Sequence, residues 1–170
     1  MMQLLASQDA IAAGGRISDD QTVFRFEADF AADLRCIPMI VRFKLDRIGI
    51  KLSLKQWTRI GVANRRRLAA LSCDTLREIS DYRRTLVNLA AHHTAEPIVE
   101  LKPDTDPCWA DTRTVASPVI QQAGAASVAS PTLAQWSTLS MLQRFALVKL
   151  ARSNHDNHNF VPALREFGLL

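Results

Sequence analysis

The sequence lacks the short motifs that carry most enzyme chemistry. It contains no glycine-rich phosphate loop and no nucleophile elbow. Its three cysteines, Cys36, Cys73 and Cys108, are far apart and form no Cys-x-x-Cys pair, so the ligand spacing of a zinc site is missing. We therefore expect a protein that is not an enzyme, with no catalytic residue, no metal and no cofactor of its own.

Membrane-targeting signals are also missing from the sequence. The first fifteen residues include no Lys or Arg, so the positively charged start of a secretory signal is absent. No apolar run approaches the roughly 20 residues that a bilayer span requires. An odd number of scattered cysteines is typical of a reducing compartment. These observations predict a cytoplasmic protein without a membrane partner.

What the chain does contain is the composition of an ordinary globular protein. It has 170 residues, of which 48% are hydrophobic and 22% are charged, enough to bury one sizeable core. We expect residues 1–21 to form a flexible tail and residues 22–170 to form a single compact helical domain.

The positive charge is concentrated in one segment. Between Arg35 and Arg67 there are ten basic residues and one acidic residue, a net charge of +9 in a chain whose total is +4. Such a segment attracts anionic partners over about 8 Å at physiological salt, and it speeds encounter more than it selects a partner. Nucleic acid, a phosphate-bearing cofactor and an acidic protein surface would all fit, and acidic residues from elsewhere in the fold could instead neutralise the charge. The candidate partner-binding residues are Arg35, Arg42, Lys44, Arg47 and Lys51.

An internal repeat is centred on two of the three tryptophans. Around Trp57 and Trp136, seven positions agree at identical offsets, with Ile and Leu exchanged at one of them. The first copy is Leu54-x-Gln56-Trp57-x-x-Ile60 with Arg65, Leu68 and Leu71, and the second is Leu133-x-Gln135-Trp136-x-x-Leu139 with Arg144, Leu147 and Leu150. Two similar helical units that pack together can bury what neither buries alone.

Helical signals dominate, so the predicted fold class is all-α. Pro38 suits the first position of a helix and Gly49 the left-handed residue past its end, which predicts a helix over 38–48. Its apolar face would hold Val41, Leu45 and Ile48, with Lys44 and Arg47 on another face. The capping box of Thr75 and Glu78 starts an apolar stripe that reaches His93.

The helical signals define two units and a connection. The first unit covers about 37–93, a proline-rich connection about 94–131, and the second unit about 132–170. Ser117-Pro118 followed by Gly124 predicts a short helix inside the connection. Side chains alternate only briefly over Val23 to Phe26, with Phe24 and Phe26 on one side, so we expect at most one short extended segment near the N-terminus.

Two histidines could share one helical face. His155 and His158 lie three residues apart beside Asp156, but no third or fourth ligand has a compelling position. An Asn-rich stretch before a helix more often satisfies backbone groups through side-chain hydrogen bonds. We predict no metal site here and leave a ligand role for these histidines open.

Several longer patterns resemble one known family. They are Phe24-x-Phe26-Glu27-x-Asp29-Phe30, the apolar and cationic stretch from Leu34 to Leu52, Gln56-Trp57, Gln143-Arg144-Phe145-Ala146-Leu147-x-Lys149-Leu150, His155-x-Asn157-x-Asn159-Phe160 and Glu166-Phe167-Gly168-Leu169. By these residues the chain resembles the nitrate reductase-associated protein family from about Phe24 to the C-terminus. The resemblance implies a non-enzymatic accessory role in the maturation or activity of a molybdenum-dependent assimilatory nitrate reductase, through protein–protein contact.

An alternative function comes from the basic segment itself. The two helices expected near 53–60 and 62–72 have the spacing of a helix-turn-helix, and the run Arg65-Arg66-Arg67 could contact DNA phosphates. The presumed reading helix has few polar side chains suited to base edges, so nucleic acid is the less favoured partner. The sequence does not determine the oligomeric state.

Overall fold

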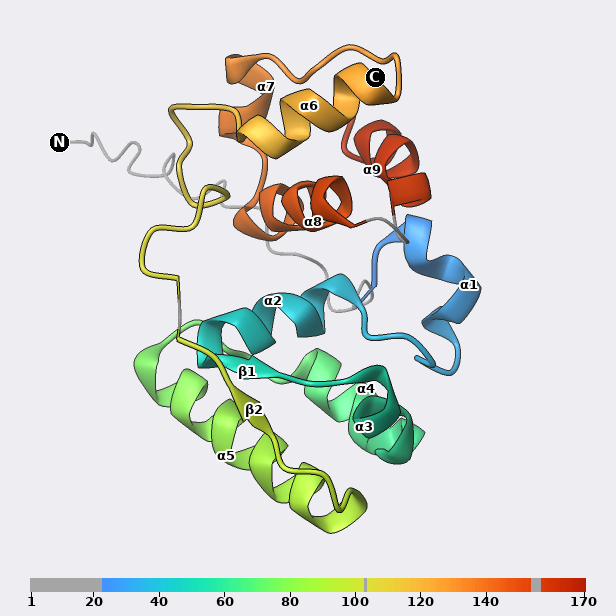
Figure 1. Ribbon diagram of the computed structural model, residues 1–170, viewed down its shortest axis with the longest axis vertical. Helices are drawn as coiled ribbons and strands as arrows, with labels where there is room; N and C mark the ends of the chain where they lie inside the picture. Colours follow the sequence, from blue (N-terminus) through green and yellow to red (C-terminus); the bar gives the residue numbers. More distant parts are fainter. Residues whose placement is uncertain (1–22, 103, 154–156) are drawn as a thin grey trace, which may run out of the picture.

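The computed structural model describes residues 23–102, 104–153 and 157–170, which fold mainly into helices (Figure 1). The all-α fold class is confirmed, whereas the tail predicted for residues 1–21 lies outside the described residues. In chain order the elements are η1 (Arg25–Glu27), α1 (Ala28–Ala31), α2 (Met39–Ile48), β1 (Ile50–Lys51), α3 (Leu54–Arg59), α4 (Val62–Ala70), α5 (Leu76–His93), β2 (Val99–Glu100), α6 (Ser117–Ala125), α7 (Leu133–Thr138), α8 (Met141–Arg152), η2 (Asn157–Asn159) and α9 (Phe160–Glu166).

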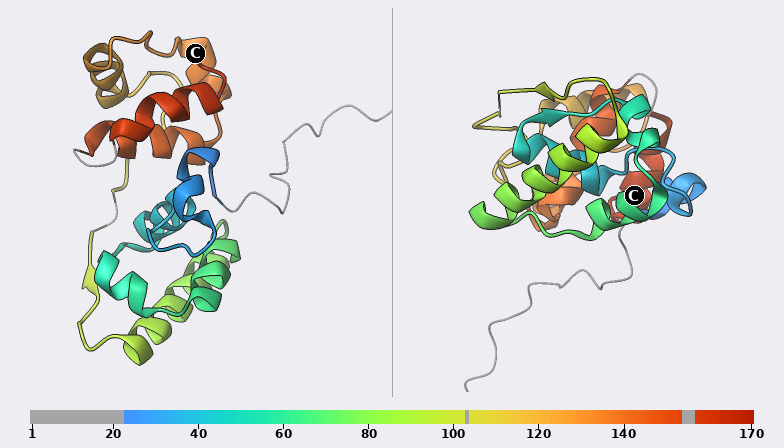
Figure 2. Two further views of the ribbon diagram at one scale, coloured as in Figure 1. Left: turned by 90° about the vertical axis from the view of Figure 1, so that its right-hand side faces the viewer. Right: turned by 90° about the horizontal axis from the view of Figure 1, so that it is seen from below.

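Helix α2 lies between two groups of helices. Helices α3, α4 and α5 occupy one end of the molecule and α6 to α9 the other, with α2 in the middle (Figures 1 and 2). Helix α2 packs against α4 and α5 on one side and against α8 on the other. We call α2 to α5 the first unit and α6 to α9 the second unit.

Each unit has its own hydrophobic core, and α2 contributes to both. Val41 and Leu45 join the cluster around Trp57 in the first unit. Met39 and Phe43, on the opposite face of α2, join the cluster around Phe145 in the second unit. The single core expected from composition is therefore two hydrophobic clusters that meet at α2. That the chain behaves as one domain stays a prediction.

Both copies of the repeat begin with the same capping box. In α3, Ser53 Oγ accepts a hydrogen bond from the Gln56 backbone N–H at 3.1 Å, and Gln56 Oε1 accepts one from the Ser53 N–H at 2.9 Å. In α7, Thr132 and Gln135 make the same reciprocal bonds at 3.2 and 2.9 Å. The box satisfies backbone donors that the first turn leaves free. The shared Ser/Thr-x-x-Gln spacing thus starts both helices.

The repeated tryptophans occupy equivalent packing sites. Trp57 and Trp136 are both 0% exposed. The indole Nε1 of Trp57 donates to the Leu34 carbonyl at 2.7 Å, and that of Trp136 donates to the Asp111 carbonyl at 2.8 Å. Each indole therefore connects its unit to the segment that precedes the unit's first helix, α2 or α6.

The repeated arginines also serve the fold. Arg65 Nε donates to the Ile60 carbonyl at 2.8 Å, and the guanidinium of Arg144 donates to the equivalent Leu139 carbonyl. Arg144 also donates through Nε to the Trp109 carbonyl at 2.9 Å and is only 5% exposed. Each guanidinium binds carbonyl groups at the bend between two helices, where no helical N–H can reach them.

The structural repeat begins earlier than the sequence repeat. Helix α6, predicted inside the connection, is confirmed and packs against α8, so it belongs to the second unit. Both α2 and α6 have a proline at their start: Pro38 directly precedes α2, and Pro118 lies in the first turn of α6. Each ends before a left-handed residue, Gly49 (φ 64°) or Ser127 (φ 54°). Pro38 is the N-cap of α2 and not its first helical residue as predicted.

The extended structure is not where the sequence places it. Strands β1 and β2 pair antiparallel, with Ile50 opposite Glu100 and Lys51 opposite Val99. The sequence allowed at most one short extended segment, near Val23 to Phe26. There the backbone is extended only at Phe24, which precedes η1.

Contacts with α9 override the short alternation that suggested an extended segment. Glu166 accepts hydrogen bonds from the backbone N–H groups of Arg25 and Phe26 at 2.8 and 3.0 Å. The Phe24 ring lies 5.2 Å from that of Phe26 and 5.1 Å from that of Phe167, measured between centroids.

Glu27 caps helix α2 from outside the helix. Pro38 has no polar side chain, so Glu27 Oε1 accepts the Met39 N–H at 2.9 Å, while Oε2 accepts the Phe24 N–H at 3.3 Å. The side chain is 3% exposed. Burial raises the pKa of Glu27 to about 7, against the opposing effect of the two backbone hydrogen bonds and of the Arg42 charge.

We expect Trp57→Ala and Trp136→Ala each to lower the free energy of unfolding by about 3 to 5 kcal/mol, the usual loss for a large buried aromatic. Urea denaturation of the two variants measures this. Leu133→Ala is the control, since Leu133 is 50% exposed and such changes usually stay within about 0.5 kcal/mol. A large loss for only one tryptophan would contradict their equivalence.

We also expect stability to fall as the pH rises through about 7. Because the folded pKa of Glu27 lies above its ordinary value, the folded state keeps a proton that the unfolded state releases. The contribution of this proton to the free energy of unfolding is complete below about pH 4.5, and it is lost as the pH rises from there to about 7. The total loss is up to about 3 kcal/mol. Urea denaturation at about pH 5 and about pH 8 should show this loss, and Glu27→Gln should flatten it. An equal pH dependence in the variant would show that another group is responsible.

Candidate functional site

Lys44 is buried, contrary to its expected place on an exposed basic surface. Its side chain is 6% exposed, and Nζ donates to the carbonyls of Ala69 and Leu71 at 2.6 Å each, at the end of α4. The ammonium also lies 5.6 Å from the centre of the Tyr82 ring. Burial lowers the pKa of Lys44 to about 8, partly opposed by the nearby Cys73 and Asp74. Lys44 therefore caps the C-terminal end of α4 and is not part of an exposed basic surface.

Arg35 and Arg42 lie at the N-terminal end of α2 and bind neighbouring groups. Arg35 is exposed, and its Nη2 lies 3.1 Å from a carboxylate oxygen of Asp29. Arg42 is half-buried, and its Nε donates to the Ile37 carbonyl at 2.9 Å. Both residues help to hold the segment that precedes α2.

Arg47 and Lys51 lie at the other end of α2 and just beyond it. Arg47 pairs with Asp74 at 3.3 Å and stacks over the Phe43 ring at 5.5 Å. Lys51 is exposed on β1. A ten-residue helix is about 15 Å long, so the five predicted residues do not form one continuous patch. Lys51 and, in part, Arg47 remain accessible to a partner.

The arginine run of the helix-turn-helix alternative is largely occupied by the fold. Helices α3 and α4 do follow each other closely, as that alternative requires. However, Arg65 donates to the carbonyls of Asp33 and Leu34 at 3.0 and 2.9 Å, and Arg66 donates to the Ala32 carbonyl at 2.6 Å. The same arginine position recurs as the buried Arg144 of the second unit, which favours a structural role for Arg65.

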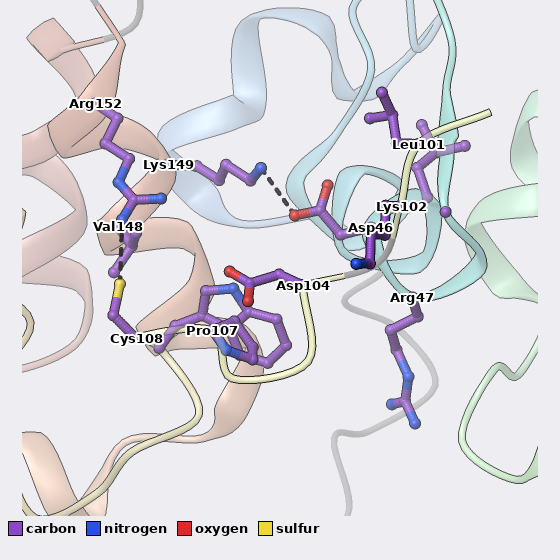
Figure 3. A pocket seen from close by; sticks show the side chains of 13 residues that line it. Asp46, Arg47, Leu101, Lys102, Asp104, Pro107, Cys108, Val148, Lys149 and Arg152 are labelled. Carbon is purple, nitrogen blue, oxygen red and sulfur yellow. Dashed lines mark hydrogen bonds and ion pairs between the residues drawn. The ribbon is translucent and has the colours of Figure 1, made fainter. Parts of the chain in front are cut away.

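A cleft of about 310 Å³ lies between the two units. Its walls come from the C-terminal part of α2, the connection after β2, and α8 (Figure 3). Asp46 of α2 and Lys149 of α8 meet in it at 2.8 Å and join the two units by an ion pair. The charged residues that line the cleft are Asp46, Arg47, Lys102, Asp104, Lys149 and Arg152.

A cluster of three aromatic rings lies where the two units meet. Phe43, Trp109 and Phe145 pack edge to face, with centroids 5.2 to 5.6 Å apart. Of these, Trp109 also lines the cleft, together with apolar side chains from both units. Lys149 lies 5.2 Å from the centre of the Phe145 ring, so its ammonium contacts both an aromatic face and a carboxylate. The cleft thus offers cations, hydrogen-bond acceptors and an apolar wall to a ligand.

Only Arg47 of this cleft was among the predicted site residues. Lys149 and Arg152 were missed because the repeat alignment draws attention to positions that agree. Their equivalents in the first copy are Ala70 and Cys73. The difference between the two copies could have indicated Lys149 and Arg152, because a cation present in only one copy is not needed for the packing that both copies share.

The thiols and histidines give no second candidate site. Cys73 is buried, Cys36 and Cys108 are half-buried, and all three are free thiols. His158 is exposed in η2, whereas His155 lies outside the described residues, so the predicted pair is not described. Within residues 23–102, 104–153 and 157–170, no three His, Cys, Asp or Glu side chains gather as metal ligands would.

We expect Lys44→Met to destabilise the protein by about 2 to 4 kcal/mol, because two carbonyl groups lose charge-assisted hydrogen bonds inside the fold. Lys51→Met is the matched control, an exposed lysine whose loss should change the free energy of unfolding by no more than about 0.5 kcal/mol. Chemical denaturation measures both. Equal stability of the two variants would contradict the structural role of Lys44.

Comparison with known proteins connects this fold to one family. A family model described as a conserved nitrate reductase-associated protein matches residues 23–167, nearly all of the chain. No curated protein and no solved structure gives a match. Among the described residues, no helix combines the length and the apolar character needed to cross a bilayer. The extent of the match supports the resemblance indicated by the sequence patterns, and the chain belongs to the nitrate reductase-associated protein family.

Proposed function

We propose that the protein is a non-enzymatic accessory factor that contacts a molybdenum-dependent assimilatory nitrate reductase and supports its maturation or activity. Family membership supplies the link to nitrate reductase. The direct contact and its effect on the enzyme are our proposal, and they require an accessible surface with features of a protein interface.

The outer face of the small sheet is the surface that supports this proposal best. Lys51 and Val99 are cross-strand neighbours, so their side chains lie on the same face. Leu101 continues this face, since its N–H donates to the Gly49 carbonyl at 2.8 Å and side chains alternate along an extended chain. Val99 is 51% and Leu101 48% exposed. We call Lys51, Val99 and Leu101 the sheet face.

The sheet face combines apolar side chains with nearby positive charge. Exposed aliphatic groups are removed from water when a partner binds, and this burial favours the complex by about 25 cal/mol per Å² of apolar area. Lys51 lies within the face, and Lys102 follows Leu101 directly at the mouth of the cleft. Charges at the rim of an interface mainly raise the association rate, whereas the buried apolar centre slows dissociation. An acidic, partly apolar patch on nitrate reductase is the complementary surface.

The proposal includes a location in the cytoplasm. Three cysteines that are all free thiols suit a reducing compartment. An assimilatory enzyme and its accessory factor would meet there without crossing a membrane.

We predict that the double variant Lys51→Glu/Val99→Ser binds purified nitrate reductase at least tenfold more weakly, since it removes apolar area and reverses a charge. The matched control is Leu76→Ser/Arg77→Glu, which changes an apolar residue and a cation that are 88% and 92% exposed in the first turn of α5 and are not part of the sheet face. Surface plasmon resonance measures both affinities. Equal affinities would exclude the sheet face as the contact, and failure of the unaltered protein to bind would exclude the direct contact itself.

A further inference from the structure

Two cations in the cleft have no carboxylate partner. Lys102 and Arg152 are exposed and line the cleft, and neither forms an ion pair within the part of the chain that the structure describes. Arg47 and Lys149, by contrast, pair with Asp74 and Asp46. Within the described part of the chain, Arg152 makes one hydrogen bond to a side chain. Its Nη2 donates to the Cys108 sulfur at 3.4 Å, and sulfur is a weak acceptor. Asp104 also lines the cleft and forms no ion pair among the described residues, so the unpaired charges of these residues there are two positive and one negative, and the cleft keeps a net positive charge.

These two cations lie at opposite ends of the cleft. Figure 3 shows Arg152 on one side of the Lys149–Asp46 pair and Lys102 on the other. Lys149, one turn before Arg152 on α8, adds to the positive charge at the Arg152 end. A guanidinium with a neighbouring ammonium suits a phosphate group, because its planar fork can bind two phosphate oxygens at once.

The middle of the cleft has a different chemistry. The carboxylates of Asp46 and Asp104 line it and accept hydrogen bonds from hydroxyl groups. Trp109 and the partly exposed Leu101 contribute an apolar wall. A volume of about 310 Å³ is at the small end of the range for ligand sites and fits a metabolite better than a peptide.

We propose that this cleft binds a small polyhydroxylated organic anion with a negatively charged group at each end, of the sugar bisphosphate class. One phosphate contacts Arg152 and Lys149, the other contacts Lys102, and the hydroxyl groups between them donate to Asp46 and Asp104. A ligand held in this way connects α8 of the second unit to the segment that follows β2. This binding concerns the purified protein alone and is independent of the contact with nitrate reductase.

Isothermal titration calorimetry of the full chain with fructose 1,6-bisphosphate, at constant low ionic strength, tests the proposal. We expect saturable one-to-one binding, and at least tenfold weaker binding of fructose 6-phosphate, which lacks the second phosphate. Lys102→Ala and Arg152→Ala should each weaken the bisphosphate at least tenfold. Lys102→Ala should also bring the affinity for the bisphosphate close to that for the monophosphate.

The controls separate a built site from general attraction of anions. Lys55→Ala and Arg77→Ala remove one exposed lysine and one exposed arginine outside the cleft, and both should leave the affinity unchanged. In two-dimensional NMR spectra the indole signal of Trp109 should shift on binding, while those of the fully buried Trp57 and Trp136 stay in place. Absence of saturable binding, or equal weakening by the cleft and control variants, would overturn the proposal.

Discussion

Helix α2 has to satisfy two hydrophobic cores at once, and the rest of the structure depends on this constraint. Val41 and Leu45 face the first core, whereas Met39 and Phe43 face the second. A helix with apolar side chains on two faces has little room for charges that reach solvent. The basic residues of α2 consequently lie at its ends or bind backbone carbonyls, and the cleft forms beside its last turn, where the two units separate.

The strongly basic segment is thus a structural feature more than a binding patch. Lys44, Arg65 and Arg66 donate to backbone carbonyls that have no helical partner. A cation is well suited to such carbonyls, because its hydrogen bonds are stronger than those of neutral donors. Sequence charge alone cannot distinguish this use from attraction of a partner. The cations left for binding are fewer, and those of the cleft come from separate parts of the chain.

Local sequence signals predicted the helices well, and tertiary contacts explain what they missed. The predicted capping box at Thr75, the αL residue Gly49 and the buried tryptophans all depend on short spacings. The burial of Lys44 and the 3₁₀ turn at Arg25 depend on partners 25 and more residues away. The cleft could not be predicted, since Arg47, Lys102 and Arg152 come to line one cavity only after the units pack on α2.

Association with nitrate reductase through direct contact is the central claim, and co-purification from a native extract tests it most directly. A tagged full-length protein, expressed at its normal level, would be isolated after nuclease treatment and the eluate quantified by mass spectrometry. We predict that the nitrate reductase polypeptide is recovered in a near-stoichiometric amount and that nuclease does not reduce it. Recovery of nucleic acid or of other proteins in stoichiometric amounts, with no nitrate reductase, would contradict the account.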